Sequence, residues 1–209
     1  MLSSLSTSLP QASLAVTILG SAIGTYLALS APNPSPDSLT LAPFGLLALH
    51  TTGLVITHPE IPSFLLRNGA ENGPEVSFIT WSTATTIPLS LILCAGIPLR
   101  LIPCPSLGKN FTFALPLPDR LETNGFYRYM QHPSYTGLVV LVLSNIALLC
   151  RIDGAVSCWI PPSWGGYILV WLFGVWTRVR QEERMLRANF GVNWEEWHSK
   201  TPRFLPWRF

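Results

Sequence analysis

Apolar residues are concentrated in five long runs, which alternate with short polar segments. The runs cover roughly Ser13–Ala31, Leu41–Thr57, Phe78–Ile102, Leu138–Cys150 and Trp164–Val179. A helix needs about 17 to 25 apolar residues to cross a bilayer, and the first three runs reach that length. The last two reach it only if the fourth begins near Pro133 and both tilt or pack as a hairpin. Helices in a soluble core give a similar signal for these two, but the three longer runs favour the membrane. The pattern predicts an all-α integral membrane protein with about five transmembrane helices.

Composition supports the same interpretation. Charged residues make up 11% of the chain and the mean hydropathy is +0.36, whereas soluble domains carry about 25% charged residues. The formal charge of +2 and the absence of a dense Lys/Arg run exclude a nucleic-acid-binding surface. We therefore expect the lipid bilayer, and no nucleic acid, as a partner.

The four cysteines show no CxxC spacing, so we expect no metal site. Cys150 and Cys158 flank a short loop and could pair in an oxidising lumen. Their interpretation as small, buried apolar residues is favoured.

The basic residues predict how the chain is oriented. Arg100 at the end of the third apolar run, the segment after that run and the tail that begins at Arg178 together account for 11 of the 13 Lys and Arg residues. The positive-inside rule places the loop 103–134 and the C-terminus together in the cytosol.

The tail is polar but carries apolar residues at three- and four-residue spacings, which is typical of an amphipathic interfacial helix. We expect this helix to be broken near Gly191. Arg178 and Glu182 are four residues apart and so share one helix face. A carboxylate there could bind a cation and the arginine an anion, next to lipid; a plain surface ion pair is the alternative.

The stretch NGFYRYMQHPSYTG, Asn124 to Gly137, joins a polar cluster to the fourth apolar run. Pro133 disfavours helical dihedrals at His132 and is itself suited to begin a helix, whose free N–H groups attract an anion. Tyr127 and Tyr135 offer ring faces to a base or a sulfonium ion. The alternative is an aromatic belt of tyrosines with His132 on the surface.

These segments together resemble a known family. LETNGFYRYMQHPSYTG (Leu121–Gly137), the pattern R-x-x-x-E-E-x-x-L-x-x-x-F-G from Arg178 to Gly191, and TPRFLP (Thr201–Pro206) are similar to the isoprenylcysteine carboxyl methyltransferases; LGKNFTF (Leu107–Phe113) is also similar to a family segment. The resemblance implies two regions: residues 1–106 as a three-span membrane region and residues 107–209 as the catalytic region.

The resemblance further implies an S-adenosylmethionine-dependent O-methyltransferase of the endoplasmic reticulum membrane. Its substrate would be the carboxylate of a C-terminal prenylated cysteine, or a smaller prenylated or lipid-like acid. Arg178 would act in catalysis and bind the substrate carboxylate. The residues implied to line the cofactor pocket are Asp119, Arg120, Leu121, Glu122, Tyr127, His132, Pro133, Ser134, Tyr135 and Glu182.

Two positions depart from the family pattern. Gln131 stands where the family has an arginine, and Glu122 stands where it has a valine. Arg128 could substitute for the missing guanidinium in binding the substrate; otherwise the substrate differs.

Two other functions stay open at the sequence level. One is a membrane sterol or steroid reductase that uses NADPH, whose family has a similar His-Pro motif and tail. Ser134 and the Glu182-Glu183 pair favour the methyltransferase. The other is a divergent, non-catalytic homologue.

Overall fold

The computed structural model describes residues 7–30, 42–66, 73–103, 119–151, 154–158 and 166–204, without the side chains of 157 and 166–171. The segment LGKNFTF and the basic residues Arg67, Lys109 and Arg208 lie outside these ranges. Every regular element in the described part is helical, which confirms the all-α fold there. The long helices are α1 (Leu9–Leu29), α2 (Ala42–Thr57), α6 (Pro133–Leu149) and α7 (Gly166–Phe190), with shorter α3 (Thr83–Leu91), α4 (Ile97–Leu101) and α8 (Val192–Lys200).

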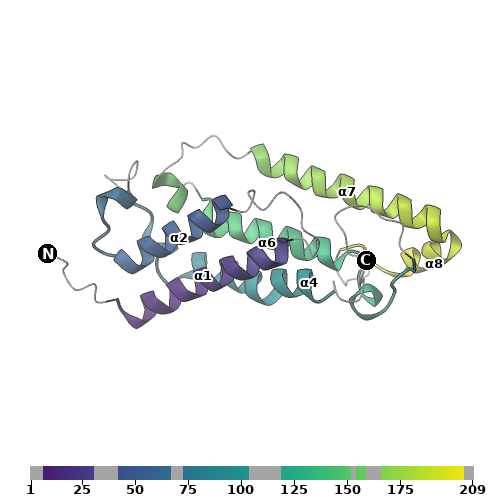
Figure 1. Ribbon diagram of the computed structural model, residues 1–209, viewed down its shortest axis with the longest axis horizontal. Helices are drawn as coiled ribbons and strands as arrows, with labels where there is room; N and C mark the ends of the chain where they lie inside the picture. The colour runs from purple at the N-terminus through teal and green to yellow at the C-terminus, as the bar shows by residue number, and fades with distance from the viewer. Residues whose placement is uncertain are drawn as a thin grey trace.

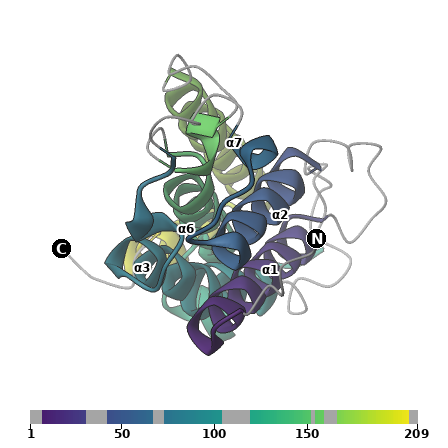
Figure 2. The same ribbon diagram turned by 90° about the vertical axis from the view of Figure 1, so that its left-hand side faces the viewer.

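The first helices form a bundle around α6, which contacts α2, α3 and α4 (Figure 1). Seen end-on, α1, α2, α3 and α6 lie side by side and α7 stands to one side of them (Figure 2). Fully buried Leu14, Ile18, Leu54, Ile92 and Leu141 belong to one apolar core. Their burial at roughly 25 cal/mol per Å² of apolar surface is the main force that joins the helices.

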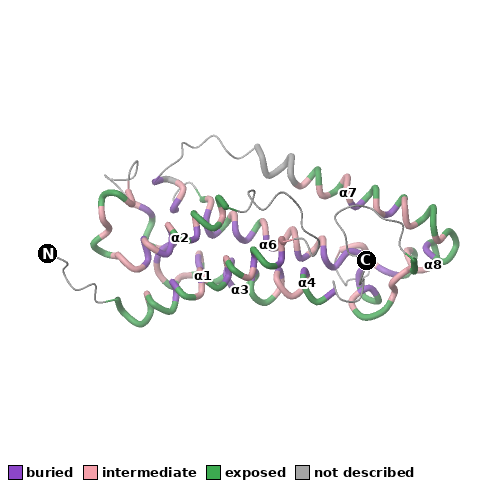
Figure 3. Tube along the Cα trace, in the orientation of Figure 1, coloured by how far each residue is buried: buried purple, intermediate pink, exposed green. Residues whose placement is uncertain are grey.

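The outer surface of the bundle is also apolar, and buried and exposed stretches alternate along its helices (Figure 3). Val16 and Ile23 on α1 and Leu46 and Leu49 on α2 are 61 to 69% exposed. A soluble monomer rarely exposes large contiguous apolar areas, so this surface suits contact with lipid chains.

Two helical segments in the described ranges are long and apolar enough to cross a membrane, namely Leu9–Leu29 and Val76–Leu101. Ala42–Thr57 and Pro133–Leu149 are apolar but shorter. The helices follow the predicted runs, and α6 begins at Pro133 as expected. The count of five spans stays a prediction.

The third apolar run is interrupted between its two prolines, as expected for a kinked span. Pro88 lies inside α3, a π-helical turn covers Ile92–Gly96, and α4 follows with Pro98 in its first turn. Proline lacks the N–H that a regular helix needs, and a π-turn is one way in which a helix accommodates this loss.

Two glycines allow this interrupted helix to approach α6 closely. A Cβ added at Gly137 would lie 2.7 Å from the backbone N of Arg100 and 3.0 Å from the carbonyl of Gly96. One added at Gly96 would lie 2.7 Å from Cγ of Leu141. The close approach brings the end of α4 to the beginning of α6.

The tail continues the fifth apolar run in one helix, because α7 runs without a break from the apolar segment to Phe190. The expected break is present at Gly191, which has a φ of +50°. Glycine tolerates that conformation because it has no Cβ. The short helix α8 then turns back beneath the end of α7 (Figure 1). Cys150 is a free thiol, so the alternative of a Cys150–Cys158 disulfide is wrong.

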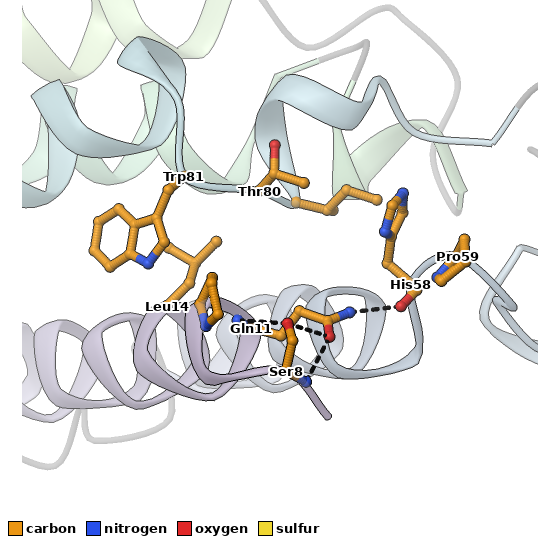
Figure 4. Close-up of a pocket in the computed structure, with 9 residues that line it drawn as sticks. Ser8, Gln11, Leu14, His58, Pro59, Thr80 and Trp81 are labelled. Atoms are coloured by element: carbon orange, nitrogen blue, oxygen red, sulfur yellow. Dashed lines mark hydrogen bonds between the residues drawn. The ribbon is translucent and has the colours of Figure 1, made fainter. Parts of the chain in front are cut away.

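A cavity of about 360 Å³ lies at the end of the bundle where α1 begins, between Leu14, His58 and Trp81 (Figure 4). The Gln11 amide in its wall donates to the carbonyls of Val55 at 3.2 Å and His58 at 2.5 Å. None of the predicted site residues lines this cavity. The hydrogen bonds of Gln11 join α1 to the end of α2, so this polar side chain stabilises the packing of the two helices.

Candidate active site

The predicted site is built around the first turn of α6. His132 precedes the helix with φ −126° and ψ 58°, and Pro133 is its first residue. This confirms the local prediction, since proline disfavours helical dihedrals in the residue before it. His132 is only 4% exposed, so the alternative in which it lies on the surface is wrong.

One turn into α6, Tyr135 meets two residues of α7. Its side chain lies close enough to the Glu182 carboxylate and the Arg178 guanidinium to interact with both charges. Arg178 and Glu182 share a face of the uninterrupted α7 helix, as their spacing predicts. A phenol, a carboxylate and a guanidinium therefore meet where α6 begins and α7 passes it, and all three side chains are only partly exposed.

Ser134 faces the opposite direction, toward α4. Its hydroxyl accepts a hydrogen bond from Nη1 of Arg100, and Nε of Arg100 donates to the carbonyl of Ala28 at 3.2 Å. Arg100 is 5% exposed. This buried guanidinium therefore joins the end of α1 to the first turn of α6, a role that the sequence analysis did not foresee.

The segment before the motif is held by α8. Tyr127 lies in the 3₁₀ turn Gly125–Arg128 and is buried, and its carbonyl accepts a hydrogen bond from Nε1 of Trp197 at 3.1 Å. Arg128 is exposed. Gln131 is buried, so the two side chains lie in different environments; a role of Arg128 in binding the substrate stays a prediction.

The residues Asp119 to Glu122 lie at the edge of the site. Asp119 and Arg120 are exposed, and Arg120 pairs with Glu122 at 3.2 Å. Glu122 also accepts a hydrogen bond from the backbone N–H of Asn124 at 3.2 Å. These described contacts are local, and they fix the entry into the 3₁₀ turn.

Glu183, which the sequence analysis did not assign to the site, is more deeply engaged than Glu182. It is 6% exposed; its Oε1 lies 2.7 Å from Nε of Arg203 and 3.4 Å from Nε2 of His132. Burial acts to raise the pKa of this carboxyl, but the nearby side chains of His132 and Arg203 outweigh it and lower the pKa to about 2. Glu183 is therefore a carboxylate at any physiological pH.

Gln131 is also buried, at 4% exposure. Its side-chain amide donates to the carbonyls of Thr201 and, at 3.1 Å, His198; its Oε1 lies 2.7 Å from Nδ1 of His198. The residue that departs from the family pattern thus binds the end of α8. The TPRFLP segment was noted in the sequence only as part of a resemblance, and no local pattern in the sequence indicated these contacts.

Comparison with known proteins agrees with the resemblance. Residues 88–188 match the model of the isoprenylcysteine carboxyl methyltransferase family. The chain is 29% identical over 121 residues to a probable protein-S-isoprenylcysteine O-methyltransferase of Oryza sativa subsp. indica, which is 56% of this chain and 58% of that protein. It is 30% identical over 138 residues to the protein-S-isoprenylcysteine O-methyltransferase of Xenopus laevis, which is 64% of this chain and 43% of that protein. These matches span only about half the length of the curated relatives. No solved structure matches the chain.

Proposed function

We propose, from the match of residues 88–188 to the isoprenylcysteine carboxyl methyltransferase family, that this chain is a membrane-bound carboxyl methyltransferase that uses S-adenosylmethionine. The proposed acceptor is the carboxylate of a prenylated cysteine at a protein C-terminus, or a smaller acid with a similar lipid chain. The proposed location is the endoplasmic reticulum membrane, with the loop 103–134 and the C-terminus in the cytosol.

The proposal rests mainly on the proximity of the Tyr135 side chain to the side chains of Glu182 and Arg178. The reaction brings together a cationic donor and an anionic acceptor. Opposite charges held side by side on one face of α7 suit both, because each charged group favours a partner of opposite sign. An arrangement of two like charges would favour only one of them.

The residues of the site fit the proposed donor. Glu182 supplies a carboxylate for its positive charge, and Tyr127 and Tyr135 supply aromatic rings, whose faces attract cations. The first turn of α6 presents the backbone N–H groups of Ser134 and Tyr135 to an anionic group such as the donor's carboxylate. When bound, S-adenosylmethionine supplies an activated methyl group. The segment from Asp119 to Glu122 would run beside the bound donor.

The tasks that remain for the protein are orientation and exclusion of water. A carboxylic acid is already ionised near pH 7, so the acceptor needs no general base. In this proposal Arg178 binds the acceptor carboxylate and aims one of its oxygens toward the donor. Holding two reactants in line in this way contributes most of the acceleration that such a reaction needs.

The position of the site at the end of an apolar bundle suits a substrate with a lipid chain. The first turn of α6 is polar, whereas the rest of the helix, up to Leu149, is almost entirely apolar. A water-soluble donor reaches the polar end, and a lipid chain fits along the apolar helices. We propose that the two reactants meet at this boundary.

The test is a comparison of ligand binding and turnover by the purified protein in detergent or lipid nanodiscs. We expect labelled S-adenosylmethionine to bind and NADPH not to bind, and we expect methyl transfer to a farnesylcysteine analogue. A fatty acid of similar length serves as a second acceptor, which tests whether the prenyl thioether is required. Binding of NADPH in place of the donor would instead support a reductase, and binding of neither would support a non-catalytic homologue.

A further inference from the structure

The segment Thr201–Phe204, called the tail segment below, is docked on the start of α6 by two backbone hydrogen bonds. The N–H of Gln131 donates to the carbonyl of Pro202, and the N–H of His132 donates to the carbonyl of Arg203, both at 2.9 Å. Oγ1 of Thr136 adds a third bond, to the carbonyl of Phe204, at 2.9 Å. The last described residues of the chain thus lie directly against the motif that begins the site.

A first side-chain anchor joins Gln131 to the end of α8. The Gln131 amide group donates to two carbonyls, and its Oε1 is an acceptor that faces Nδ1 of His198 at 2.7 Å. Nδ1 of His198 must therefore carry a hydrogen, because an amide oxygen has none to give. The other ring nitrogen is then an acceptor in the neutral imidazole, and it faces Nη2 of Arg203 at 3.4 Å.

A second anchor joins Arg203 to Glu183 of α7. Nε of Arg203 donates to Oε1 of Glu183 at 2.7 Å, and Nη2 lies 3.4 Å from Oε2. The carboxylate also faces Nε2 of His132 at 3.4 Å. Both oxygens of Glu183 are thus engaged by the protein itself, and two-point pairing of a guanidinium with a carboxylate fixes direction as well as distance.

Together the two anchors close a ring of polar side chains around the tail segment. Gln131 contacts His198, His198 contacts Arg203, Arg203 contacts Glu183, and Glu183 contacts His132, the next residue after Gln131. Within this ring Phe204 packs between His132, at 5.9 Å between ring centroids, and Trp176, at 6.3 Å. The imidazole of His132 in turn packs edge-on against the phenol of Tyr135, with 5.7 Å between the two ring centroids.

We propose that Glu183 and Gln131 are positioning residues of the active site, which lock the tail segment onto the start of α6 and so hold Tyr135 against Glu182 and Arg178. They act through the tail segment and His132 and do not touch the methyl donor. In this chain a neutral Gln131–His198 contact performs the docking at the position where the family pattern has an arginine. The inference rests on the proposed function for its catalytic consequence, but the docking itself is independent of it.

The experiment compares Glu183→Gln with Glu195→Gln, measured in nanodiscs by amide hydrogen exchange and by donor binding. Glu195 is a matched control, because it also pairs with an arginine, Arg187, at 2.8 Å, but its side chain is 51% exposed. In Glu183→Gln we expect exchange in peptides that span Gln131 and His132 to rise by about tenfold, the factor expected from the loss of one buried charged hydrogen bond. We expect the Kd and KM for the donor to rise by a similar factor while kcat changes little. Glu195→Gln should change none of these values.

The exchange measurement needs neither donor nor acceptor, so it separates the two proposals. Unchanged exchange at Gln131 and His132 in Glu183→Gln would overturn the docking role, whatever the activity. Faster exchange in a protein that transfers no methyl group would keep the docking role and refute the proposed reaction. If Glu183→Gln does not fold, Arg203→Met serves in its place, because that side chain is 40% exposed and its loss leaves no buried gap. In Arg203→Met we expect the same rise in amide exchange at Gln131 and His132, and unchanged exchange would likewise overturn the docking role.

Discussion

Glu182 and Glu183 are adjacent in the sequence but bind on different sides of the site. Glu182 interacts with the side chain of Tyr135, while Glu183 lies 2.7 Å from the guanidinium of Arg203. Successive residues of a helix point about 100° apart, so one pair of carboxylates serves two neighbouring structures. The first faces the proposed donor and the second the tail segment. Variants of the two should therefore fail in different ways.

Replacing Glu182 with glutamine should weaken donor binding directly. Glutamine keeps the size and an acceptor oxygen of the side chain but removes the negative charge, and a charged hydrogen bond is worth about 1.5–3 kcal/mol. We expect the Kd for S-adenosylmethionine to rise by roughly 10- to 100-fold, measured with labelled donor in detergent. Tyr135→Ala should abolish binding in a protein that still folds. Unchanged affinity in both variants would remove these residues from the donor site.

Replacing Arg178 with alanine should separate binding from turnover. In the proposed role this guanidinium holds the acceptor carboxylate, so the variant should bind the donor with little change and lose most of its methyl transfer. Donor binding and turnover on a farnesylcysteine analogue, measured on one preparation, test this. Arg178→Lys keeps the charge but not the planar two-point geometry and should recover only part of the rate. Undiminished turnover in Arg178→Ala would refute the role.

Replacing Gly137 with alanine should destabilise the fold. The added Cβ would meet backbone atoms of Arg100 and Gly96 at 2.7 and 3.0 Å, and backbone cannot rotate away as a side chain can. Overpacking of this kind costs about 1–3 kcal/mol, and it should lower the Tm in detergent. Gly174→Ala is the control, since nothing lies within 4 Å of its added Cβ. That variant should keep or raise the Tm, because alanine favours a helix more than glycine does.

Acidification should loosen the tail segment through His198. Burial first, and then the charge of Arg203, lower the pKa of His198 below its ordinary 6.5; His132 and Arg187 act in the same direction and Glu183 against it. A folded-state pKa below the unfolded one means that the stabilisation is complete above about pH 6.5 and declines as the pH falls from there. The matching change for Glu183, with a pKa of about 2, lies only below 4.5.

The measurement is amide exchange at Gln131 and His132, corrected for the intrinsic effect of pH, between about pH 7.5 and 5.5, where an ordinary histidine titrates. We expect exchange to rise with acidification in the native chain. His198→Asn keeps an N–H donor for Gln131 but cannot titrate, so its exchange should be insensitive to pH. An equal rise in both proteins would contradict the assignment to His198.

Replacing Gln131 with arginine should not improve the enzyme, although the family pattern has arginine there. The guanidinium would be buried beside His198 and Arg203, where Gln131 now donates to two carbonyls and accepts from an imidazole. A cation has no acceptor to offer Nδ1 of His198. We expect a lower Tm and weaker donor binding than in the native chain; a gain in either would show that the site can use the charge.

The positions of the helices could be predicted from the sequence, because each apolar run has to be covered by other helices or by lipid along its whole length. The sequence also placed Tyr135, Glu182 and Arg178 in one site, through local patterns on α6 and α7. It did not foresee that α7 continues past Arg178, because its polar end and its apolar beginning differ in composition while the helical backbone continues through both.

The polar contacts of the tail segment were beyond local patterns altogether. Arg203 is 20 residues from Glu183, and the Gln131 side chain binds carbonyls 67 and 70 residues away. Such pairs form only because the chain turns back at Gly191. The direction in which the chain continues after this turn cannot be predicted from periodicity in the sequence. From the sequence alone Glu183 could not be distinguished from its neighbour Glu182, because their different partners are apparent only in the fold.

The helix α7 runs without a break from Gly166 to Phe190. A stiff rod that begins among apolar residues and carries Arg178, Glu182 and Glu183 further along transmits any turn about its long axis to all three at once. If the proposed function holds, bilayer thickness and lateral pressure, which set how such a rod sits among its neighbours, would act on acceptor, donor and tail contacts together.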